Sequence, residues 1–384
     1  MKLFIASTPY NLLNCINMKY NLFPNEKADI LISNFDKKNE KYFNNLKNES
    51  LFDNVYFVEQ RKFNEVDNIQ NKLKRVFKKT CSELKNRYFF NSLFRKYCKG
   101  LEFYKKYDEF YVDAFGFTPR FIFNHYKKIN KNLKVFKVDC GVESYYDASE
   151  NNFITKKQKF ICGKIRKKLE GYYLYDEKIA NIGSYKVYLI PKLNLKDQNF
   201  INLINRVFEY DDGIIEGRSE KYIFLDQELS DSKPLEQMEE QIVDILNKYI
   251  NNDYIAKLHP RTNPEVKRYK NVLKMKTNST FEILCLNNDW ITKKCLITPF
   301  STAAALPKLL FDREPVVICL TKLFDNKYQE SELATNFFER LKRIYNKKDN
   351  IYIPETLEEF EKILVEIKKQ LWQNKKWVYW QKIC

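Results

Sequence analysis

Residues 254–262, YIAKLHPRT, join a short apolar run to a histidine in a chain of 384 residues that has only two histidines. A run of this length predicts a buried β-strand, and Pro260 ends it because proline has no N–H for the sheet ladder. His259 therefore stands at the carboxyl end of a predicted strand. In open α/β sheets ligands bind at that edge, so this stretch indicates both the fold class and a candidate site.

Outward from this stretch, short apolar runs alternate with longer segments of helical periodicity, which predicts parallel sheets flanked by helices. Strands are expected at residues 3–6, 30–33, 55–59, 109–113, 135–138, 222–226, 254–258, 272–275, 294–300 and 315–320, with a strand-like run at 186–190. Helices are expected after Thr8, at 66–100, 118–129, 164–172, 234–249 and 280–286, and from Ser301. The alternation predicts two Rossmann-like domains facing a cleft, 1–175 and 176–384, with a C-terminal helical tail.

Composition narrows the class of protein. The nine cysteines are scattered and never spaced as C-x-x-C, which argues against a disulfide framework or a zinc site and favours a reducing cytoplasm. The first apolar run is broken early by Ser7, Thr8 and Pro9, so no signal peptide is expected. No window reaches the roughly 18 apolar residues of a membrane span.

The formal net charge of +17 suggests a partner that is nucleic acid, an anionic membrane face or an acidic substrate. An alternative is coding bias, because the chain is rich in Lys, Asn and Ile and has only 8 glycines. No G-x-G-x-x-G follows a strand, and neither a P-loop nor an H-E-x-x-H motif is present. These absences argue against a glycine-cradled dinucleotide, P-loop phosphate transfer and zinc proteolysis.

Polar residues follow several of the predicted strands. Histidine has an unperturbed pKa of about 6.5, so His259 could donate a proton or face a phosphate; the alternative is a histidine that satisfies a loop carbonyl. Ser301 and Thr302 stand where a strand leads into a helix, and their hydroxyls with the helix N–H groups suit a phosphate or carboxylate. The alternative for Ser301 is an ordinary helix N-cap.

Two acidic residues complete this set. Glu282 is the lone acid of a short apolar helix and could hold ribose hydroxyls, or could simply favour the helix dipole in the first turn. Asp139 ends a predicted strand before Gly141, in FKVDCGVES (136–144), and a carboxylate there could act as a general base. The alternative for Asp139 is an Asx turn.

Taken in order, these motifs resemble the bacterial two-domain, GT-B sialyltransferases, most nearly the lipooligosaccharide and capsule enzymes of glycosyltransferase family 52. Those enzymes share an acidic-acidic-Gly motif, a later His-Pro motif and a subsequent pair of hydroxyl residues. KLHP provides His259 and Pro260, and the pair Ser301-Thr302 follows in the same order. The opening MKLFIASTPYNLLN is similar to the family's strand and Thr-Pro helix start, which adds Ser7 and Thr8 to the expected substrate-binding residues.

The acidic motif departs from the family pattern. Asp139 is followed by Cys140 where a second acid is expected, whereas Asp211-Asp212-Gly213 matches literally but lies in an irregular region. Asp139 is preferred because it ends a well-defined predicted strand. Asp226, at the end of another predicted strand, and Asp211 stay open as alternative bases.

The resemblance implies an inverting, metal-independent transfer of sialic acid from CMP-sialic acid, without a cofactor, to a galactose-ended glycan of capsule or lipooligosaccharide. Asp139 would be the base and His259 would act on the departing phosphate. Lys257 would lie by the cytosine, Glu282 would hold the ribose, and Pro260, Ser301 and Thr302 would contribute to the phosphate site. It further implies a cytoplasmic enzyme that acts on a lipid-linked acceptor and contacts the inner membrane face peripherally. The enzyme could also be a homodimer.

Two other functions remain open. A glycerophosphate transferase of the teichoic-acid type would use a similar His-Pro turn with CDP-glycerol. A basic nucleic-acid-binding protein would account for the charge and the 16% aromatic content, but not for the polar residues at strand ends, so nucleic acid is not the expected partner.

Overall fold

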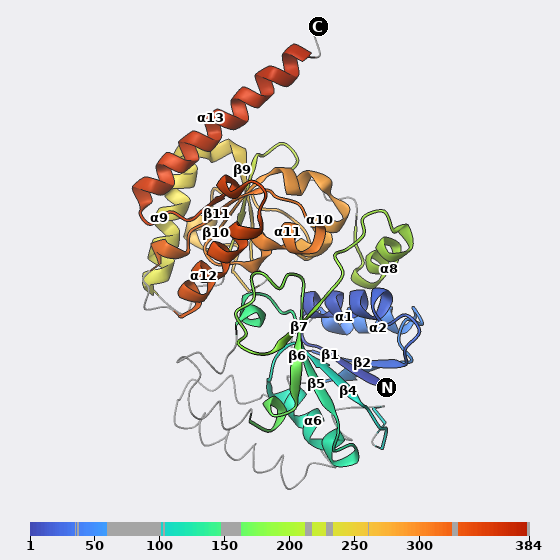
Figure 1. The fold of residues 1–384 in the computed structure, drawn as a ribbon. Helices are drawn as coiled ribbons and strands as arrows, with labels where there is room; N and C mark the ends of the chain where they lie inside the picture. Colours follow the sequence, from blue (N-terminus) through green and yellow to red (C-terminus); the bar gives the residue numbers. More distant parts are fainter. Residues whose placement is uncertain are drawn as a thin grey trace. The chain divides into compact units, whose positions relative to one another are not determined.

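The computed structural model describes residues 1–34, 36, 38–59, 101–102, 104–146, 163–211, 217–227, 233–259, 261–324 and 329–381. The chain divides into two compact units, Met1–Tyr210 and Asp211–Cys384, and each is built on its own sheet (Figure 1). All strand pairs within the described part of the chain are parallel. The predicted α/β class, with two Rossmann-like halves and a C-terminal helix, is confirmed.

The first unit contains a seven-stranded sheet in the order β3-β2-β1-β4-β5-β6-β7. Its strands are β1 (Lys2–Ala6), β2 (Ala28–Ser33), β3 (Asn54–Val58), β4 (Glu109–Val112), β5 (Lys134–Val138), β6 (Leu169–Leu174) and β7 (Lys186–Leu189). Its described helices are α1 (Pro9–Asn21), α2 (Asn39–Lys47), α6 (Phe117–Ile129) and α8 (Gln198–Phe208), with a 3-10 turn η1 at Val142–Tyr145. The helix predicted for residues 66–100 lies outside the described residues.

Helix α1 begins as its sequence predicts. The Thr8 side chain accepts a hydrogen bond from the Asn11 backbone N–H, and Pro9 occupies the first helical turn, where its missing N–H costs nothing. Leu12, Leu13 and Ile16 then face the interior and are fully buried. The cap and the apolar spacing together fix this helix directly after β1.

A row of aromatic rings crosses one face of the first sheet. Phe4, Tyr111, Phe136, Tyr173 and Tyr188 come from five adjacent strands. Neighbouring ring centroids are 4.5 Å, 5.3 Å, 5.6 Å and 5.0 Å apart in that order. Aromatic pairs at such separations contribute stabilising free energy in addition to that from burying their surface. The row therefore helps to hold these five strands in register.

Two expectations for residues 164–210 differ from the structure. The basic helix predicted for 164–172 is wrong in its second half, because residues from Leu169 onward form β6. Tyr172 and Tyr173 suit a pleated, buried strand, and Gly171 weakens a helix but allows close approach of β7. The predicted boundary at 175/176 falls instead between β6 and β7, which pair in one sheet, so the first unit extends to Tyr210.

The second unit contains a five-stranded sheet in the order β12-β11-β10-β8-β9. Its strands are β8 (Tyr222–Leu225), β9 (Tyr254–Lys257), β10 (Cys295–Thr298), β11 (Val316–Cys319) and β12 (Ile351–Tyr352). Its helices are α9 (Lys233–Ile250), α10 (Phe281–Asn287), α11 (Leu306–Phe311), α12 (Gln329–Ile344) and α13 (Leu357–Gln381). The strand predicted for 272–275 is reduced to an isolated bridge between Lys274 and Ala256 of β9.

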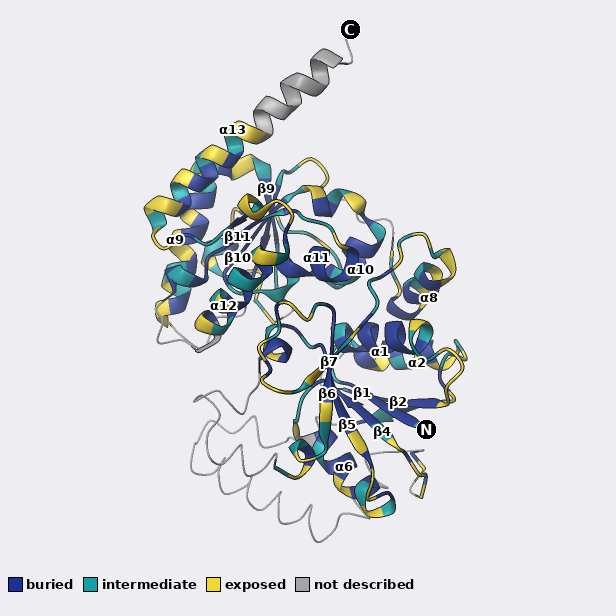
Figure 2. Cartoon of the chain, in the orientation of Figure 1, coloured by how far each residue is buried: buried dark blue, intermediate teal, exposed yellow. Residues whose placement is uncertain are grey.

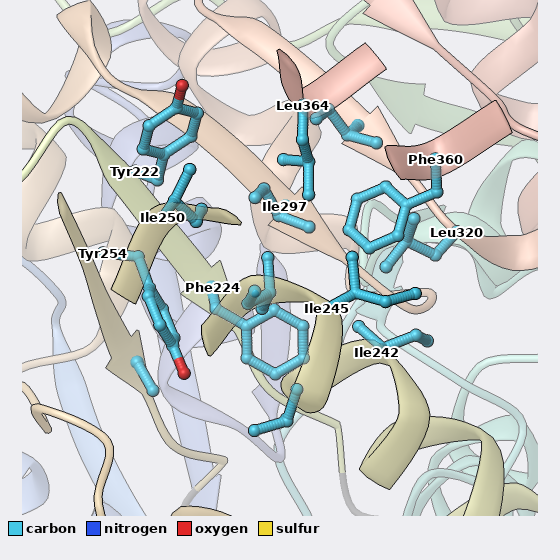
Figure 3. Packing of buried hydrophobic residues seen from close by; sticks show 14 of the residues in the cluster. Tyr222, Phe224, Ile242, Ile245, Ile250, Tyr254, Ile297, Leu320, Phe360 and Leu364 are labelled. Atoms are coloured by element: carbon cyan, nitrogen blue, oxygen red, sulfur yellow. The ribbon is translucent and has the colours of Figure 1, made fainter. Parts of the chain in front are cut away.

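Both faces of the second sheet are buried. Phe224 and Ile297 point to the face covered by α9 and α13, where they meet Ile242 and Leu364 (Figure 3). Because side chains alternate along a strand, Ile223 and its neighbours point to the opposite face, and they are also fully buried. Figure 2 shows the strands of this sheet in dark blue and α9 with both buried and exposed residues along its length. Continuous apolar strands of this kind are typical of parallel sheets.

None of the described helices is both long enough and apolar enough to cross a bilayer.

Gly171 gives a test of the contact between β6 and β7. A Cβ at this position would lie 2.4 Å from the Lys186 carbonyl oxygen and 2.9 Å from the Tyr188 ring. We expect Gly171→Ala to lower the free energy of unfolding by roughly 1–3 kcal/mol, as overpacking does, because one close atom is backbone. Urea unfolding followed by circular dichroism measures the change.

The matched control is Gly163→Ala, where a Cβ would meet no atom within 4 Å. Alanine there should be neutral or stabilising by less than about 1 kcal/mol. Equal stability of the two variants would contradict the tight β6–β7 approach.

Candidate functional site

The candidate site of the second unit lies at the carboxyl edge of its sheet. Strand β8 runs between β9 and β10, so the ends of these three strands are neighbours. The predicted site residues Lys257, His259, Ser301 and Thr302 come from the ends of β9 and β10 or from the turns that follow. All four are half-buried, as ligand-contacting side chains at a sheet edge are expected to be.

The turn that carries His259 is fixed by hydrogen bonds. Its backbone N–H donates to Asp226 Oδ2 at 2.9 Å, and its carbonyl accepts from the Thr262 N–H at 2.9 Å. Its Nδ1 accepts from the Arg261 N–H at 3.3 Å, which assigns the proton of the neutral ring to Nε2. His259 thus presents Nε2–H as a donor, while Pro260 lies outside the described residues.

The Ser301-Thr302 turn is tied to β8, the strand that Asp226 follows. The Thr298 hydroxyl donates to the Leu225 carbonyl at 3.1 Å and accepts from the Ser301 N–H at 2.9 Å. Ser301 Oγ in turn accepts from the Ala303 N–H at 3.3 Å and caps the 3-10 turn Thr302–Ala305, which leads into α11. Ser301 therefore fulfils the alternative role of a cap, on a half-buried turn whose position Thr298 determines.

Glu282 and Lys257 lie within electrostatic reach of one buried thiol. Glu282 is in the first turn of α10, and Cys285 lies on the same helix. Burial raises the pKa of Cys285 well above its usual value; the Glu282 charge adds to the shift, and Lys257 and Arg313 oppose it. The second unit thus brings the predicted cytosine and ribose residues into one neighbourhood.

Asp226 lies beneath the His259 turn rather than on the surface. Its side chain is 3% exposed, and its second oxygen, Oδ1, accepts from the Tyr269 hydroxyl at 2.6 Å. Both carboxylate oxygens are thus engaged within the protein, although Asp226 was an alternative base in the sequence.

Asp139 occupies the corresponding edge of the first unit, directly after β5. It is fully buried: Oδ1 accepts from the Gly141 N–H at 2.8 Å and Oδ2 from the Tyr145 hydroxyl at 2.6 Å. The first contact is the Asx turn weighed as the alternative, and Gly141 has φ of 106°, which favours glycine. Burial raises the pKa of Asp139 to about 6, opposed by the Tyr145 and Gly141 hydrogen bonds.

Asparagines of α1 hold the backbone at this point. Asn11 and Asn14 donate their side-chain N–H groups to the Asp139 carbonyl at 3.3 Å and 2.8 Å. Asn17, one turn further on, donates to the Pro191 carbonyl at 2.7 Å. A buried row of amides on one helix thus satisfies carbonyls that follow two strands of the sheet.

Asp113 is an acidic residue that the sequence interpretation missed as part of the site. It follows β4, is 4% exposed and accepts hydrogen bonds from the Ala114 N–H and from Ser7. Burial raises its pKa above the ordinary value. Since β4 lies between β1 and β5, Ser7, Asp113 and Asp139 all follow neighbouring strands. The sequence did contain a signal for Asp113, because it is an acidic residue at the end of a predicted strand.

The remaining predicted residues are divided between the units. Ser7 and Thr8 are half-buried at the start of α1 in the first unit. Asp211 is exposed and begins the second unit, while Asp212 and Gly213 lie outside the described residues. No cluster of three or more His, Cys, Asp or Glu side chains able to hold a metal ion occurs among the described residues.

Comparison with solved structures bears on the fold. An α/β-galactoside α-2,3-sialyltransferase from the luminous marine bacterium Photobacterium phosphoreum superposes with a TM-score of 0.51 at 13% identity, over 92% of this chain and 97% of that chain. The chain has a GT-B fold.

Weaker similarities link the chain to two other proteins. UDP-GlcNAc 2-epimerase from Methanocaldococcus jannaschii has a TM-score of 0.47 at 13% identity, over 95% and 100% of the two chains. An E. coli heptosyltransferase with ADP has a TM-score of 0.41 at 12% identity, over 97% and 100%. No family model and no curated protein matches the sequence.

The raised pKa of Asp139 predicts how stability depends on pH. The folded state holds the proton more tightly than the unfolded state, so the contribution is fully present below about pH 4 and is lost as pH rises through about 6. We expect Asp139→Asn, which cannot ionise, to gain about 3 kcal/mol relative to wild type between these limits. Urea unfolding at both ends of the range measures this difference.

A stability difference that does not change with pH would contradict the buried, proton-retaining carboxyl. Glu143→Gln is the control, because Glu143 is exposed four residues further along the same turn and should leave the profile unchanged.

Proposed function

We propose that the protein is a glycosyltransferase that moves sialic acid from CMP-sialic acid to a galactose-ended glycan, with inversion at the anomeric carbon. The proposal rests on the motifs His259-Pro260 and Ser301-Thr302 and on the GT-B fold shared with the Photobacterium phosphoreum sialyltransferase. Neither a resident metal nor a cofactor has a part in it, since CMP-sialic acid is consumed as a substrate.

One observation carries the proposal. The turns of His259 and Ser301 are both anchored to the end of β8, one through Asp226 and the other through Thr298 and the Leu225 carbonyl. A proton donor and a pair of hydroxyls are therefore held by one strand end at the ligand-binding edge of the sheet. This combination suits a leaving group that carries a phosphate.

The second unit would stabilise the negative charge that develops on the phosphate of the departing CMP. As the bond between the anomeric carbon and the phosphate oxygen breaks, its electron pair stays on the phosphate. His259 Nε2–H can donate to that phosphate, and the hydroxyls of Ser301 and Thr302 can donate to its other oxygens. Lys257 and Glu282 would hold the cytosine and the ribose hydroxyls.

The acceptor hydroxyl must lose a proton as it attacks the anomeric carbon. We assign the base to Asp139, because burial gives it a pKa of about 6, close to the pH at which a general base works best. The acceptor hydroxyl then takes the place of the Tyr145 hydroxyl at Oδ2. Ser7 and Thr8, half-buried after β1, are proposed to line the acceptor side.

The acceptor is proposed to be a glycan of capsule or lipooligosaccharide on a lipid carrier, reached from the cytoplasmic side of the membrane. The net charge of +17 supports this, because basic proteins are attracted to the anionic inner face of the membrane. Peripheral attachment would keep the enzyme near such an acceptor, and a homodimer would strengthen that attachment.

Removal of the His259 imidazole tests the leaving-group role. We expect His259→Ala to lower the rate of CMP release from CMP-sialic acid by about 10²- to 10⁴-fold, the usual contribution of a general acid, with an unchanged unfolding temperature. Glu265→Gln, an exposed residue of the same loop, is the control and should keep the wild-type rate. Coupled detection of CMP measures both.

The same assay separates the donor classes. Release of CMP from CDP-glycerol, with none from CMP-sialic acid, would replace the proposal by glycerophosphate transfer. Salt-sensitive binding of oligonucleotides without turnover of either donor would indicate a nucleic-acid-binding protein.

The base assignment is tested with Asp139→Asn and Asp211→Asn. We expect the first to lose at least about 10²-fold in transfer to a galactoside and the second to keep most of it. The opposite result would move the base to Asp211, which is exposed and belongs to the literal acidic-acidic-Gly motif.

A further inference from the structure

A cluster of buried polar side chains lies beneath the His259 turn, and Asp226 is its only member that was singled out in the sequence. Asp226 follows β8, Glu239 lies on α9, and Arg268 and Tyr269 come from the 3-10 turn Lys267–Tyr269. Asp226 is 3% exposed, and Glu239 and Tyr269 are fully buried. The cluster thus joins the end of β8, a helix and a loop below one predicted catalytic side chain.

We propose that Asp226 is a positioning residue for His259, held in place from below by Tyr269 and Glu239. The inference rests on the proposed function only for its catalytic consequence, and its structural part stands on the contacts themselves. In this proposal Asp226 acts through the His259 backbone, to which its Oδ2 is hydrogen-bonded, and not by contact with the donor or acceptor.

Asp226 contacts the strand before His259 and the turn that carries it. Its backbone N–H donates to the Lys257 carbonyl at 3.1 Å, as the last step of the ladder between β8 and β9. Its side-chain Oδ2 accepts the His259 N–H at 2.9 Å. The two bonds bracket residues 257–259, so one amino acid determines both where β9 ends and where the turn begins.

The second layer of contacts fixes the carboxylate itself. Tyr269 donates its hydroxyl to Asp226 Oδ1 at 2.6 Å and lies 3.0 Å from Glu239 Oε1. Arg268 Nε lies 2.7 Å from Glu239 Oε2, with its side chain 6% exposed. Because both oxygens of the Asp226 carboxylate accept hydrogen bonds, the carboxylate cannot rotate without breaking a buried hydrogen bond. Breaking such a bond costs free energy.

The position of the turn sets the orientation of the imidazole. Once the His259 N–H is fixed, its carbonyl and Nδ1 receive the N–H groups of Thr262 and Arg261. These bonds direct Nε2–H away from the turn's own backbone. A shift of the backbone at His259 would therefore be passed to the proton that acts on the leaving group, and small misplacements reduce rates strongly.

The two acids of the cluster have different partners. Asp226 accepts the His259 N–H at one oxygen and the Tyr269 O–H at the other. Burial and the charge of Asp226 raise the pKa of Glu239 to about 9, against the opposing effect of Arg268. Glu239 is therefore protonated near neutral pH, and Glu239→Gln should be tolerated where Asp226→Ala is not.

The experiment compares Asp226→Ala, Tyr269→Phe and Glu239→Gln in the full chain. For each variant it measures kcat and KM for CMP-sialic acid, the exchange rate of the His259 amide proton and the unfolding temperature. We expect Asp226→Ala to lower kcat by about 10- to 100-fold with little change in KM, and Tyr269→Phe to lower it less. The amide should exchange faster in both, and Glu239→Gln should stay near wild type.

A matched pair elsewhere separates positioning from simple loss of stability. In the first unit, Tyr107 donates to the buried Asp29 at 2.5 Å, and both residues are fully buried. Tyr107→Phe should lower the unfolding temperature as Tyr269→Phe does, while leaving kcat and the His259 amide unchanged. If Tyr107→Phe and Tyr269→Phe lower kcat equally, the proposal is overturned.

The structural readout also distinguishes this inference from the proposed function. With only two histidines in the chain, the ring nitrogen signals of His259 are identified by their loss in His259→Ala. If wild type releases no CMP from CMP-sialic acid, the donor proposal fails, and faster amide exchange with altered ring signals in Asp226→Ala still supports the positioning role. Unchanged exchange and ring signals in that variant would overturn it, whatever the activity.

Discussion

Parallel pairing of the strands is the constraint on which the rest of this structure depends. Each described strand pair runs in the same direction, so the carboxyl ends of a sheet all meet at one edge. Residues far apart in the chain, such as Ser7 and Asp139 or His259 and Ser301, therefore come to the same edge of their sheet, with one strand between the two strand ends that carry them. The chemistry of each unit is thereby concentrated where the strands end.

That edge has a cost, because the backbone leaves the ladder there and its N–H and C=O groups need new partners. Buried side chains meet the need: Asp226 receives the His259 N–H, Thr298 bridges Leu225 and Ser301, and Asn14 donates to the Asp139 carbonyl. The outcome is an inner layer of enclosed polar groups that shapes the backbone. The half-buried residues above it, Lys257, His259, Ser301 and Thr302, are the ones proposed to meet a ligand.

Sequence periodicity was sufficient for most of the strands, their direction and the polar residues that follow them, because those features depend on local patterns of burial; it missed β6 and β12. It was insufficient where contacts between distant segments decide. Residues from Leu169 onward form a strand since β5 and β7 flank them, which no local pattern reports. Tyr269 and Glu239 look like ordinary loop and helix residues until the fold brings the Tyr269 hydroxyl against both Glu239 and Asp226. Asp113 was likewise not recognised from the sequence, because its contact with Ser7 forms only in the folded chain.

The asparagines of α1 give the first unit a property that its charged residues could not. Asn11, Asn14 and Asn17 hold carbonyl groups after β5 and β7 with neutral amides. Such contacts neither titrate nor weaken as dissolved ions screen charge. In a protein of net charge +17, whose surface ion atmosphere changes with salt concentration, these three contacts of α1 do not depend on salt. The carboxyl edge of the first sheet is therefore expected to keep its backbone geometry when the salt concentration changes.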